Sequence, residues 1–201
     1  MVFAMTVPMT QPARLVLVTP KVEDPAAWPG PLTDMLAAAV SAGPVDAVIL
    51  RLPALDERSL LKAVKPVVSA VQEGNAALLL EDATSIVVRS GADGVHLTGP
   101  AGLAEALDLL KKQDRIVGIG GLGARHDAME AAETGIDYVL FGEPRRDGSL
   151  PPLAGVLERA QWWAELFQVP CVGYAPTLEA VGPMAETGCE FVAVGDAVFS
   201  H

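Results

Sequence analysis

Cysteine is scarce in this chain of 201 residues, which contains only Cys171 and Cys189. Their spacing fits neither a metal site nor a disulfide framework, so we expect two buried thiols and a reduced, cytoplasmic setting. Basic residues are also few, since 14 Lys and Arg stand against 25 Asp and Glu, for a formal net charge of −11. Such an excess of negative charge repels nucleic acid and anionic membranes, so neither is expected as a partner.

Long apolar runs are absent too. None approaches the roughly 20 residues that a membrane-spanning helix needs. The first twelve residues lack the charged start and the long apolar core of a secretory signal. Aromatic residues make up only 5% of the chain, yet hydrophobic residues reach 51%. This composition predicts a folded protein with a large aliphatic core rather than a disordered chain.

What the chain does contain is one short phrase repeated four times. Each copy has a glycine, then an acidic residue, then a valine-rich apolar run. The copies are residues 43–50, 91–97, 135–141 and 188–194. The glycine can end a helix in the left-handed conformation, and the apolar run suits a strand that is buried on both faces. The spacing of about 45 residues is that of two strand–helix units in a barrel.

Further apolar runs between these copies supply the other strands, at residues 14–19, 76–80, 115–119 and 169–174. Stretches with helical spacing separate the strands. The sequence therefore predicts an α/β fold, a (β/α)8 TIM barrel, as a single domain over residues 1–201 with an N-terminal extension at 1–13. Only residues 196–201 follow the last strand, so we expect a truncated eighth helix. A second copy of the chain could cover the exposed flank, which predicts a homodimer, or the N-terminal segment could fold beneath it.

Three motifs resemble the thiamine phosphate synthase family and its thiazole tautomerase branch. They are Leu15-Val-Leu-Val-Thr19, Gly91-Ala-Asp-Gly-Val-His-Leu97 and Asp137-Tyr-Val-Leu-Phe-Gly142. The resemblance spans the whole chain and implies a barrel of thiamine biosynthesis that binds a small phosphorylated heterocycle at its C-terminal mouth. Synthases of this family join a pyrimidine pyrophosphate to a thiazole phosphate with Mg²⁺. The tautomerases move a proton to aromatise a thiazole carboxylate phosphate.

The chain departs from the synthase pattern at positions that handle metal and substrate. Of the family's Gln-x-Arg-x-Lys after the second strand, only Arg51 remains. Of its two metal-binding aspartates, Asp82 remains and the other position holds Ala101, which has no oxygen ligand to offer Mg²⁺. Asp82 is thus the single candidate metal ligand that the resemblance leaves.

The phosphate-binding positions differ as well. The family's serine after the fifth strand aligns with Gly120, and the Ile-Gly-Gly after the seventh strand is replaced by residues 174–176, where Pro176 has no N–H to donate. Asp196 places a carboxylate where the family binds phosphate. We therefore expect an inherited barrel whose synthase reaction is lost or altered.

Several residues at the expected ends of the second and third strands are candidates for substrate binding. Arg51 either anchors the anion of a substrate or pairs with Glu81 or Asp82 across the mouth. Because Glu81 and Asp82 are adjacent, they should point to opposite sides of the strand. One of them is expected to face the mouth, as a substrate or metal ligand, and the other to cap the helix that begins near Thr84.

Glu143 is the candidate catalytic residue. It follows the sixth strand, where the tautomerases place a histidine that serves as the base, and a carboxylate in an apolar mouth can do similar work. Gly142 and Arg145 are expected to contact substrate beside it. Alternatively, Glu143 is a loop carboxylate paired with Arg145 or Arg146. His96 is expected to be a hydrogen-bonded core histidine.

Residues 118–123 match the pattern Gly-x-Gly-x-x-Gly. The pattern can mark a dinucleotide site, although it occurs here on the fifth strand rather than the first. It can also offer the N–H groups of Gly120 and Gly121 to a phosphate. Three functions thus stay open: a transferase or tautomerase of thiamine biosynthesis, a non-catalytic barrel that binds a metabolite or a partner, and a nucleotide-dependent enzyme.

Overall fold

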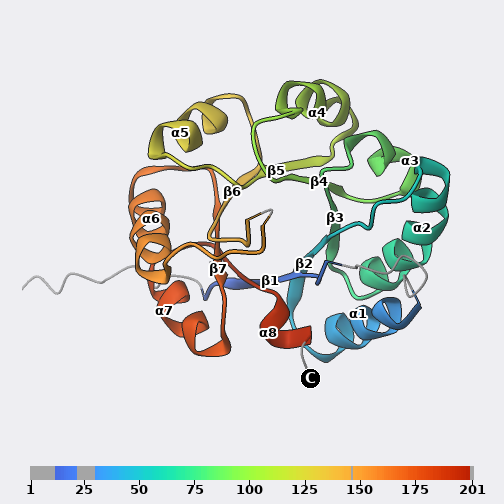
Figure 1. The fold of residues 1–201 in the computed structure, drawn as a ribbon, viewed down its shortest axis with the longest axis horizontal. Coiled ribbons are helices and arrows are strands. Elements are labelled where there is room, and N and C mark those ends of the chain that lie inside the picture. Colours follow the sequence, from blue (N-terminus) through green and yellow to red (C-terminus); the bar gives the residue numbers. More distant parts are fainter. Residues whose placement is uncertain (1–11, 22–29, 146, 200–201) are drawn as a thin grey trace, which may run out of the picture.

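The fold is a closed ring of parallel strands. A computed structural model describes residues 12–21, 30–145 and 147–199, and in these residues the strands pair in sequence order from β1 to β8, with β8 also paired to β1. Figure 1 shows the ring along its axis, with the helices arranged around it. The predicted TIM barrel is therefore confirmed. The strands are β1 (Arg14–Val18), β2 (Val45–Leu50), β3 (Ala77–Glu81), β4 (Gly94–Leu97), β5 (Ile116–Ile119), β6 (Tyr138–Phe141), β7 (Cys171–Ala175) and β8 (Phe191–Val194).

The helices follow the strands in turn, as expected from the helical spacing. They are α1 (Gly30–Ala42), α2 (Glu57–Glu73), α3 (Val87–Ser90), α4 (Leu103–Leu110), α5 (Arg125–Glu133), α6 (Leu153–Leu166), α7 (Val181–Glu186) and α8 (Asp196–Phe199). Within the described residues α8 comprises four residues. It lies between α7 and α1 (Figure 1). Most of the expected N-terminal extension, residues 1–11, lies outside the described residues.

The acidic residue of the repeated phrase ties neighbouring strands together. Asp93 accepts a hydrogen bond from the backbone N–H of Leu78 at 2.8 Å, and Asp137 accepts one from Val117 at 2.7 Å. Glu190 accepts the N–H of Cys171 at 2.9 Å. In each case a carboxylate before an even strand satisfies a backbone donor of the odd strand before it, and a bond to a charged acceptor is a strong one. The first copy differs, because Asp46 lies 3.7 Å from Arg14.

Two layers of side chains form the core. The larger layer lies between the strands and the helices and includes Trp163, which is fully buried. The smaller layer fills the barrel itself with alternate residues of the strands. Both cysteines are free and buried, as expected, and burial raises the pKa of each thiol. The inward-pointing residues near the carboxyl ends of the strands therefore decide what a ligand at the mouth would meet.

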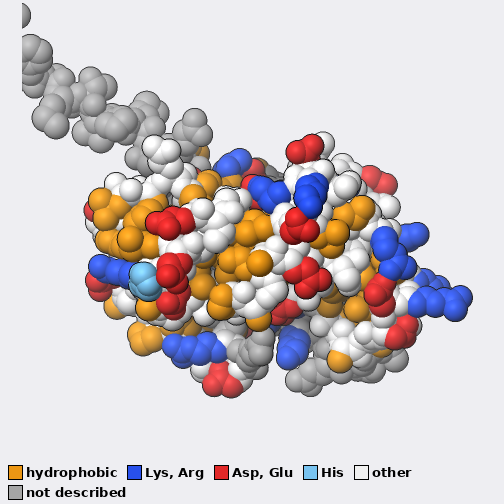
Figure 2. Space-filling model, turned by 90° about the horizontal axis from the view of Figure 1, so that it is seen from above, with side chains coloured by type: hydrophobic (Ala, Val, Ile, Leu, Met, Phe, Trp, Pro, Cys, Tyr) orange, Lys and Arg blue, Asp and Glu red, His pale blue; other side chains and the backbone are white. Residues whose placement is uncertain are grey.

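On the face that Figure 2 presents, no one type of side chain dominates the surface. Side chains of both charge signs are interspersed there with hydrophobic ones. No helix within the described ranges combines the length and the apolar composition that a membrane crossing requires.

Candidate functional site

A cavity of about 280 Å³ lies at the C-terminal mouth of the barrel. Its lining combines cations and carboxylates from several loops: Lys21, Arg51, Glu81, Asp82, Thr98, Gly121, Glu143, Pro144 and Arg145. The structure thus brings together all the residues predicted for the site except Gly120 and Gly142. Lys21 was missed by the sequence interpretation, although a cation just past the end of the first strand could have signalled it.

A second cavity, of about 190 Å³, opens at the other end of the barrel. Its lining is mostly apolar, and its two charged residues, Arg14 and Asp46, contact one another at 3.7 Å. Active sites of TIM barrels form at the C-terminal face, where loops from all eight strands converge. The mouth, with its convergent charged groups, is accordingly the candidate active site.

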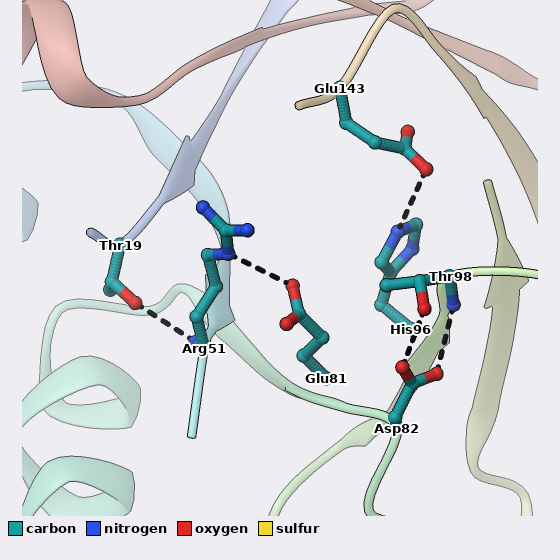
Figure 3. A network of polar contacts seen from close by, with 7 residues as sticks. All are labelled: Thr19, Arg51, Glu81, Asp82, His96, Thr98 and Glu143. Carbon is teal, nitrogen blue, oxygen red and sulfur yellow. Dashed lines mark hydrogen bonds and ion pairs between the residues drawn. The ribbon is translucent and has the colours of Figure 1, made fainter. Parts of the chain in front are cut away.

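Arg51 and Glu81 form an ion pair across the mouth. Arg51 Nε lies 3.1 Å from Glu81 Oε2, and the two side chains are only 15% and 21% exposed. Thr19 holds the backbone beneath them, since its hydroxyl oxygen accepts the N–H of Arg51 at 2.9 Å. The predicted salt bridge is therefore confirmed. Because the contact with Glu81 uses Nε (Figure 3), the two terminal guanidinium nitrogens can still donate to an anion.

The Glu81 carboxyl makes the free energy of unfolding depend on pH. Burial raises its pKa above the ordinary 4.5, and the positive charge of Arg51 only partly opposes that rise. The folded state therefore holds this proton more tightly than the unfolded chain, so ionisation of Glu81 lowers the free energy of unfolding as the pH rises from about 4.5 through the raised pKa.

We expect Glu81→Gln to remove this decline while its amide oxygen still accepts from Arg51. Urea unfolding of both proteins at intervals between about pH 4 and pH 7 gives the comparison. The variant should gain stability relative to the wild type as the pH rises through this range. A difference between the two proteins that stays constant with pH would contradict the assigned pKa direction.

Asp82 has a structural task that sequence reasoning did not predict. Its backbone has a φ of 49°, in the left-handed region. Its carboxylate accepts hydrogen bonds from the backbone N–H of Thr98 at 2.9 Å and from the Thr98 hydroxyl at 2.5 Å (Figure 3). The helix near Thr84 begins without a side-chain cap. The expectation that either Glu81 or Asp82 caps this helix was therefore wrong, because Arg51 and Thr98 engage them instead.

These contacts also bear on the predicted Mg²⁺ site. Both Asp82 oxygens are already acceptors for Thr98, and Ala101 lines the hollow beside them. No cluster of three or more His, Cys, Asp or Glu side chains suited to a metal occurs in the described part of the chain. Mg²⁺ is usually bound through one or two carboxylates together with substrate phosphates. The residues present do not fit a metal site of the family's kind.

Glu143 turns into the barrel rather than towards the loop arginines. Gly142 makes the turn with a φ of 99°, and a Cβ there would meet Val156 at 2.6 Å. The Glu143 side chain is 11% exposed, and its Oε1 lies 3.9 Å from His96 Nε2 (Figure 3). Arg145 contacts Ser149 instead. The alternative that pairs Glu143 with Arg145 is therefore wrong, and Arg146 lies outside the described residues.

Close packing explains part of the glycine pattern at residues 118–123. A Cβ on Gly118 would lie 2.0 Å from the ring of Tyr138, and one on Gly120 would lie 1.9 Å from Glu143 Oε1. A Cβ on Gly121, whose φ is 65°, would lie 2.0 Å from the carbonyl oxygen of Thr98. Their neighbours thus require Gly118 and Gly121, whereas a Cβ on Gly123, the last glycine of the motif, would meet nothing within 4 Å.

The expected phosphate site at Gly120 and Gly121 requires a correction. The N–H of Gly120 already donates to the carbonyl oxygen of Leu97 at 2.7 Å. It is therefore not free to bind phosphate, although Gly121 does line the mouth. The carbonyl oxygens of Leu122 and Gly123 accept from Arg159, which holds the rest of this loop.

Tyr174 on β7 lies inside the barrel and contacts the start of α8. Its ring is only 3% exposed, and its hydroxyl is hydrogen-bonded to the backbone of Asp196 at the start of α8. Burial raises the pKa of this phenol, and the negative charge of Asp196 raises it further. An anion at this place would meet an engaged backbone group beside a carboxylate, so the cationic side of the mouth is the favourable one.

Comparison with known proteins agrees with this architecture. The sequence model of the family described as "Thiamine monophosphate synthase" matches residues 15–198. The thiamine-phosphate synthase of Rhodospirillum centenum is 36% identical over 190 residues, which cover 94% of this chain and 90% of that protein. The thiamine-phosphate synthase of Hyphomonas neptunium is 33% identical over 198 residues, with 94% and 86% covered.

Solved structures show the same fold. The thiamine phosphate pyrophosphorylase from Pyrococcus furiosus aligns with a TM-score of 0.75 at 22% identity, over 94% of this chain and 88% of that one. The N-acetylmannosamine-6-phosphate 2-epimerase from Clostridium perfringens aligns with a TM-score of 0.69 at 12% identity, over 94% and 89%. At such low identities the likeness concerns the fold alone. The family match and the curated relatives carry the assignment: the chain belongs to the thiamine monophosphate synthase family.

Proposed function

We propose that this chain binds a small heterocyclic phosphate at the C-terminal mouth of the barrel, as a member of its family in which the synthase reaction is lost or altered. The observation that carries the proposal is the cavity of about 280 Å³ lined by Lys21, Arg51 and Arg145 together with Glu143. Glu81 and Asp82 line the same cavity, so the attraction for a phosphate comes from the local placement of the three cations and not from a net positive charge. Glu143 gives the same cavity an acid–base group.

The phosphate is assigned to the cationic side of this cavity. Arg51 is fixed by its contact with Glu81 and can present its terminal nitrogens as a fork, which suits a phosphate. Lys21 and Arg145 are exposed and can move to meet the ligand. The heterocyclic ring is then directed inward, towards Glu143 and the buried lining of the barrel.

Proton transfer is the chemistry that this arrangement supports best. Glu143 is placed to take a proton from a bound ring and to return it at another atom, as the base of a tautomerase does. Coupling of a pyrophosphate substrate would need strong stabilisation of the leaving group, and the donor set around Asp82 does not fit Mg²⁺. No step of the proposal therefore passes through a metal ion.

Calorimetric titration tests this proposal and separates it from the alternatives. Thiazole phosphate, thiamine phosphate and pyrophosphate are each added with and without Mg²⁺. We expect the heterocyclic phosphates to bind with affinities that Mg²⁺ leaves unchanged. If none of the three compounds binds, the proposal is overturned in favour of a non-catalytic partner-binding barrel. NADH is titrated separately, and binding of NADH alone would favour the nucleotide-dependent enzyme.

Arg145→Ala is expected to weaken binding of the heterocyclic phosphate about 10- to 100-fold, because a hydrogen bond to a charged group contributes about 1.5–3 kcal/mol. Arg89→Ala is the matched control, since Arg89 is an exposed arginine on α3 that pairs with Glu57. It should leave the affinity unchanged. Equal losses of affinity in both variants would show that only the overall charge of the protein matters.

The homodimer and the cytoplasmic location stay predictions.

A further inference from the structure

A line of three buried side chains crosses the inside of the barrel. Tyr138 on β6 places its hydroxyl 2.8 Å from His96 Nδ1 on β4, and the two rings lie parallel to within 7°. The opposite ring nitrogen, His96 Nε2, faces Glu143 Oε1 at 3.9 Å. Tyr138 is 7% exposed and His96 is 2% exposed, so water has little access to either contact.

Glu143 is poorly satisfied where it lies. Both of its carboxylate oxygens are buried and accept no hydrogen bond from the described residues. The place it occupies exists because residue 120 is a glycine, whose missing Cβ would overlap Oε1. Burial of a carboxylate without partners is unfavourable in free energy, so a hydrogen-bond donor beside Glu143 would stabilise the fold. His96 Nε2 is the nearest nitrogen that can supply one, at a distance that a small side-chain rotation closes.

Two contacts of His96, with Tyr138 at Nδ1 and with Glu143 at Nε2, together favour one position for the hydrogen of its neutral imidazole. Burial raises the pKa of the Tyr138 phenol well above 10, and the negative charges of Glu143 and Asp137 raise it further. The hydroxyl therefore keeps its proton at neutral pH and can donate to Nδ1. A neutral imidazole that accepts at Nδ1 carries its hydrogen on Nε2. The other tautomer would set the bare lone pair of Nε2 against the carboxylate of Glu143.

We propose that His96 is a positioning residue for Glu143. Tyr138 holds His96 as the Nε2–H tautomer, and this N–H donates to one carboxylate oxygen of Glu143 when a ligand enters. That contact leaves the second oxygen of Glu143 directed at the ligand, as a base requires. The inference deepens the proposed function and rests on it, since it assigns a support to the residue that moves the proton there.

The tautomer can be observed directly by NMR on protein labelled with ¹⁵N in its histidines, without any ligand. The chain has three histidines, so the spectrum is simple to assign. We expect neutral His96 to give the Nε2–H pattern. Tyr138→Phe and Glu143→Gln each remove one group that favours this tautomer, and each should increase the Nδ1–H fraction about fivefold, the equivalent of one net hydrogen bond of about 1 kcal/mol.

The surface pair of His126 and Glu130 provides a matched control, because these side chains lie 3.2 Å apart on α5 and are exposed. Glu130→Gln repeats the Glu143→Gln change outside the barrel and should leave the His96 signals unmoved. An Nδ1–H tautomer in the wild type, or a His96 spectrum that neither Tyr138→Phe nor Glu143→Gln alters, would overturn the proposal. Failure of the calorimetric titration with an Nε2–H spectrum would instead overturn the proposed function and leave the tautomer of His96 established.

A second comparison separates positioning from mere support of the core. The side-chain amide of His96→Gln can donate from about the place of Nε2, whereas that of His96→Asn reaches only the place of Nδ1. We expect the Gln variant to keep the affinity for thiazole phosphate within about threefold and the Asn variant to lose about tenfold, the worth of a hydrogen bond to a charged group. Equal affinities in two variants of equal melting temperature would contradict a positioning role.

Discussion

Thiamine phosphate formation by this protein is expected to be at least about a thousandfold slower than by the Rhodospirillum centenum relative, which is named a thiamine-phosphate synthase. The physical reason lies in the mouth. Removal of one well-placed donor to developing charge costs about 10²–10³ in rate. Here the oxygens of Asp82 are engaged by Thr98 and the neighbouring position is Ala101, so the expected loss exceeds that of a single group.

The measurement supplies both proteins with a pyrimidine pyrophosphate, a thiazole phosphate and Mg²⁺ under one set of conditions, and follows the product. The R. centenum protein is the positive control, since it is 36% identical over nearly the whole of both chains. A rate within about tenfold of that control would contradict the loss of synthase chemistry. Such a ratio corresponds to a difference of less than about 1.4 kcal/mol between the activation free energies of the two proteins.

Gly118→Ala is expected to reduce the free energy of unfolding by about 3 kcal/mol, at the upper end of the usual cost of overpacking. The added Cβ would lie 2.0 Å from the ring of Tyr138, and this ring cannot retreat because its hydroxyl is held by His96 inside the barrel. Thermal unfolding should register the change as a melting temperature lower by roughly 6–12 °C.

Gly120→Ala provides the contrast for that experiment, because it adds the same methyl group two residues further along β5 and its following loop. The three atoms nearest to its Cβ all belong to the Glu143 carboxyl, the end of a flexible side chain that can swing towards the mouth. We expect a cost of about 1 kcal/mol or less, together with loss of the contact between Glu143 and His96. Equal destabilisation by the two substitutions would show that Glu143 is held as rigidly as Tyr138.

The barrel could be predicted from the sequence because its determinants are local and periodic. The repeated Gly–acid–Val phrase marked every even strand, and the structure explains the acid at Asp93, Asp137 and Glu190 as an acceptor for the backbone of the strand before it. The resemblance to known motifs, which the family match confirms, pointed to the same fold independently.

The site was harder to predict because its contacts join residues far apart in the sequence. The ion pair of Arg51 and Glu81 was foreseen as an alternative, since a half-buried arginine needs a partner. The bond between Asp82 and Thr98 was not foreseen, because it depends on the left-handed backbone of Asp82, which no local pattern signals. Nor did the sequence show that Gly142 would direct Glu143 inward.

Closure of the ring has a consequence for how the protein acquires its structure. β1 pairs with β8, so the last ladder of hydrogen bonds joins segments from nearly opposite ends of the described chain. The entropy lost in closing so long a loop must be met before that ladder forms, which slows acquisition of the native state relative to proteins with local pairing. Until then β1 and β8 are unpaired edges that can recruit strands of other molecules, so misassembly competes most strongly at this one seam.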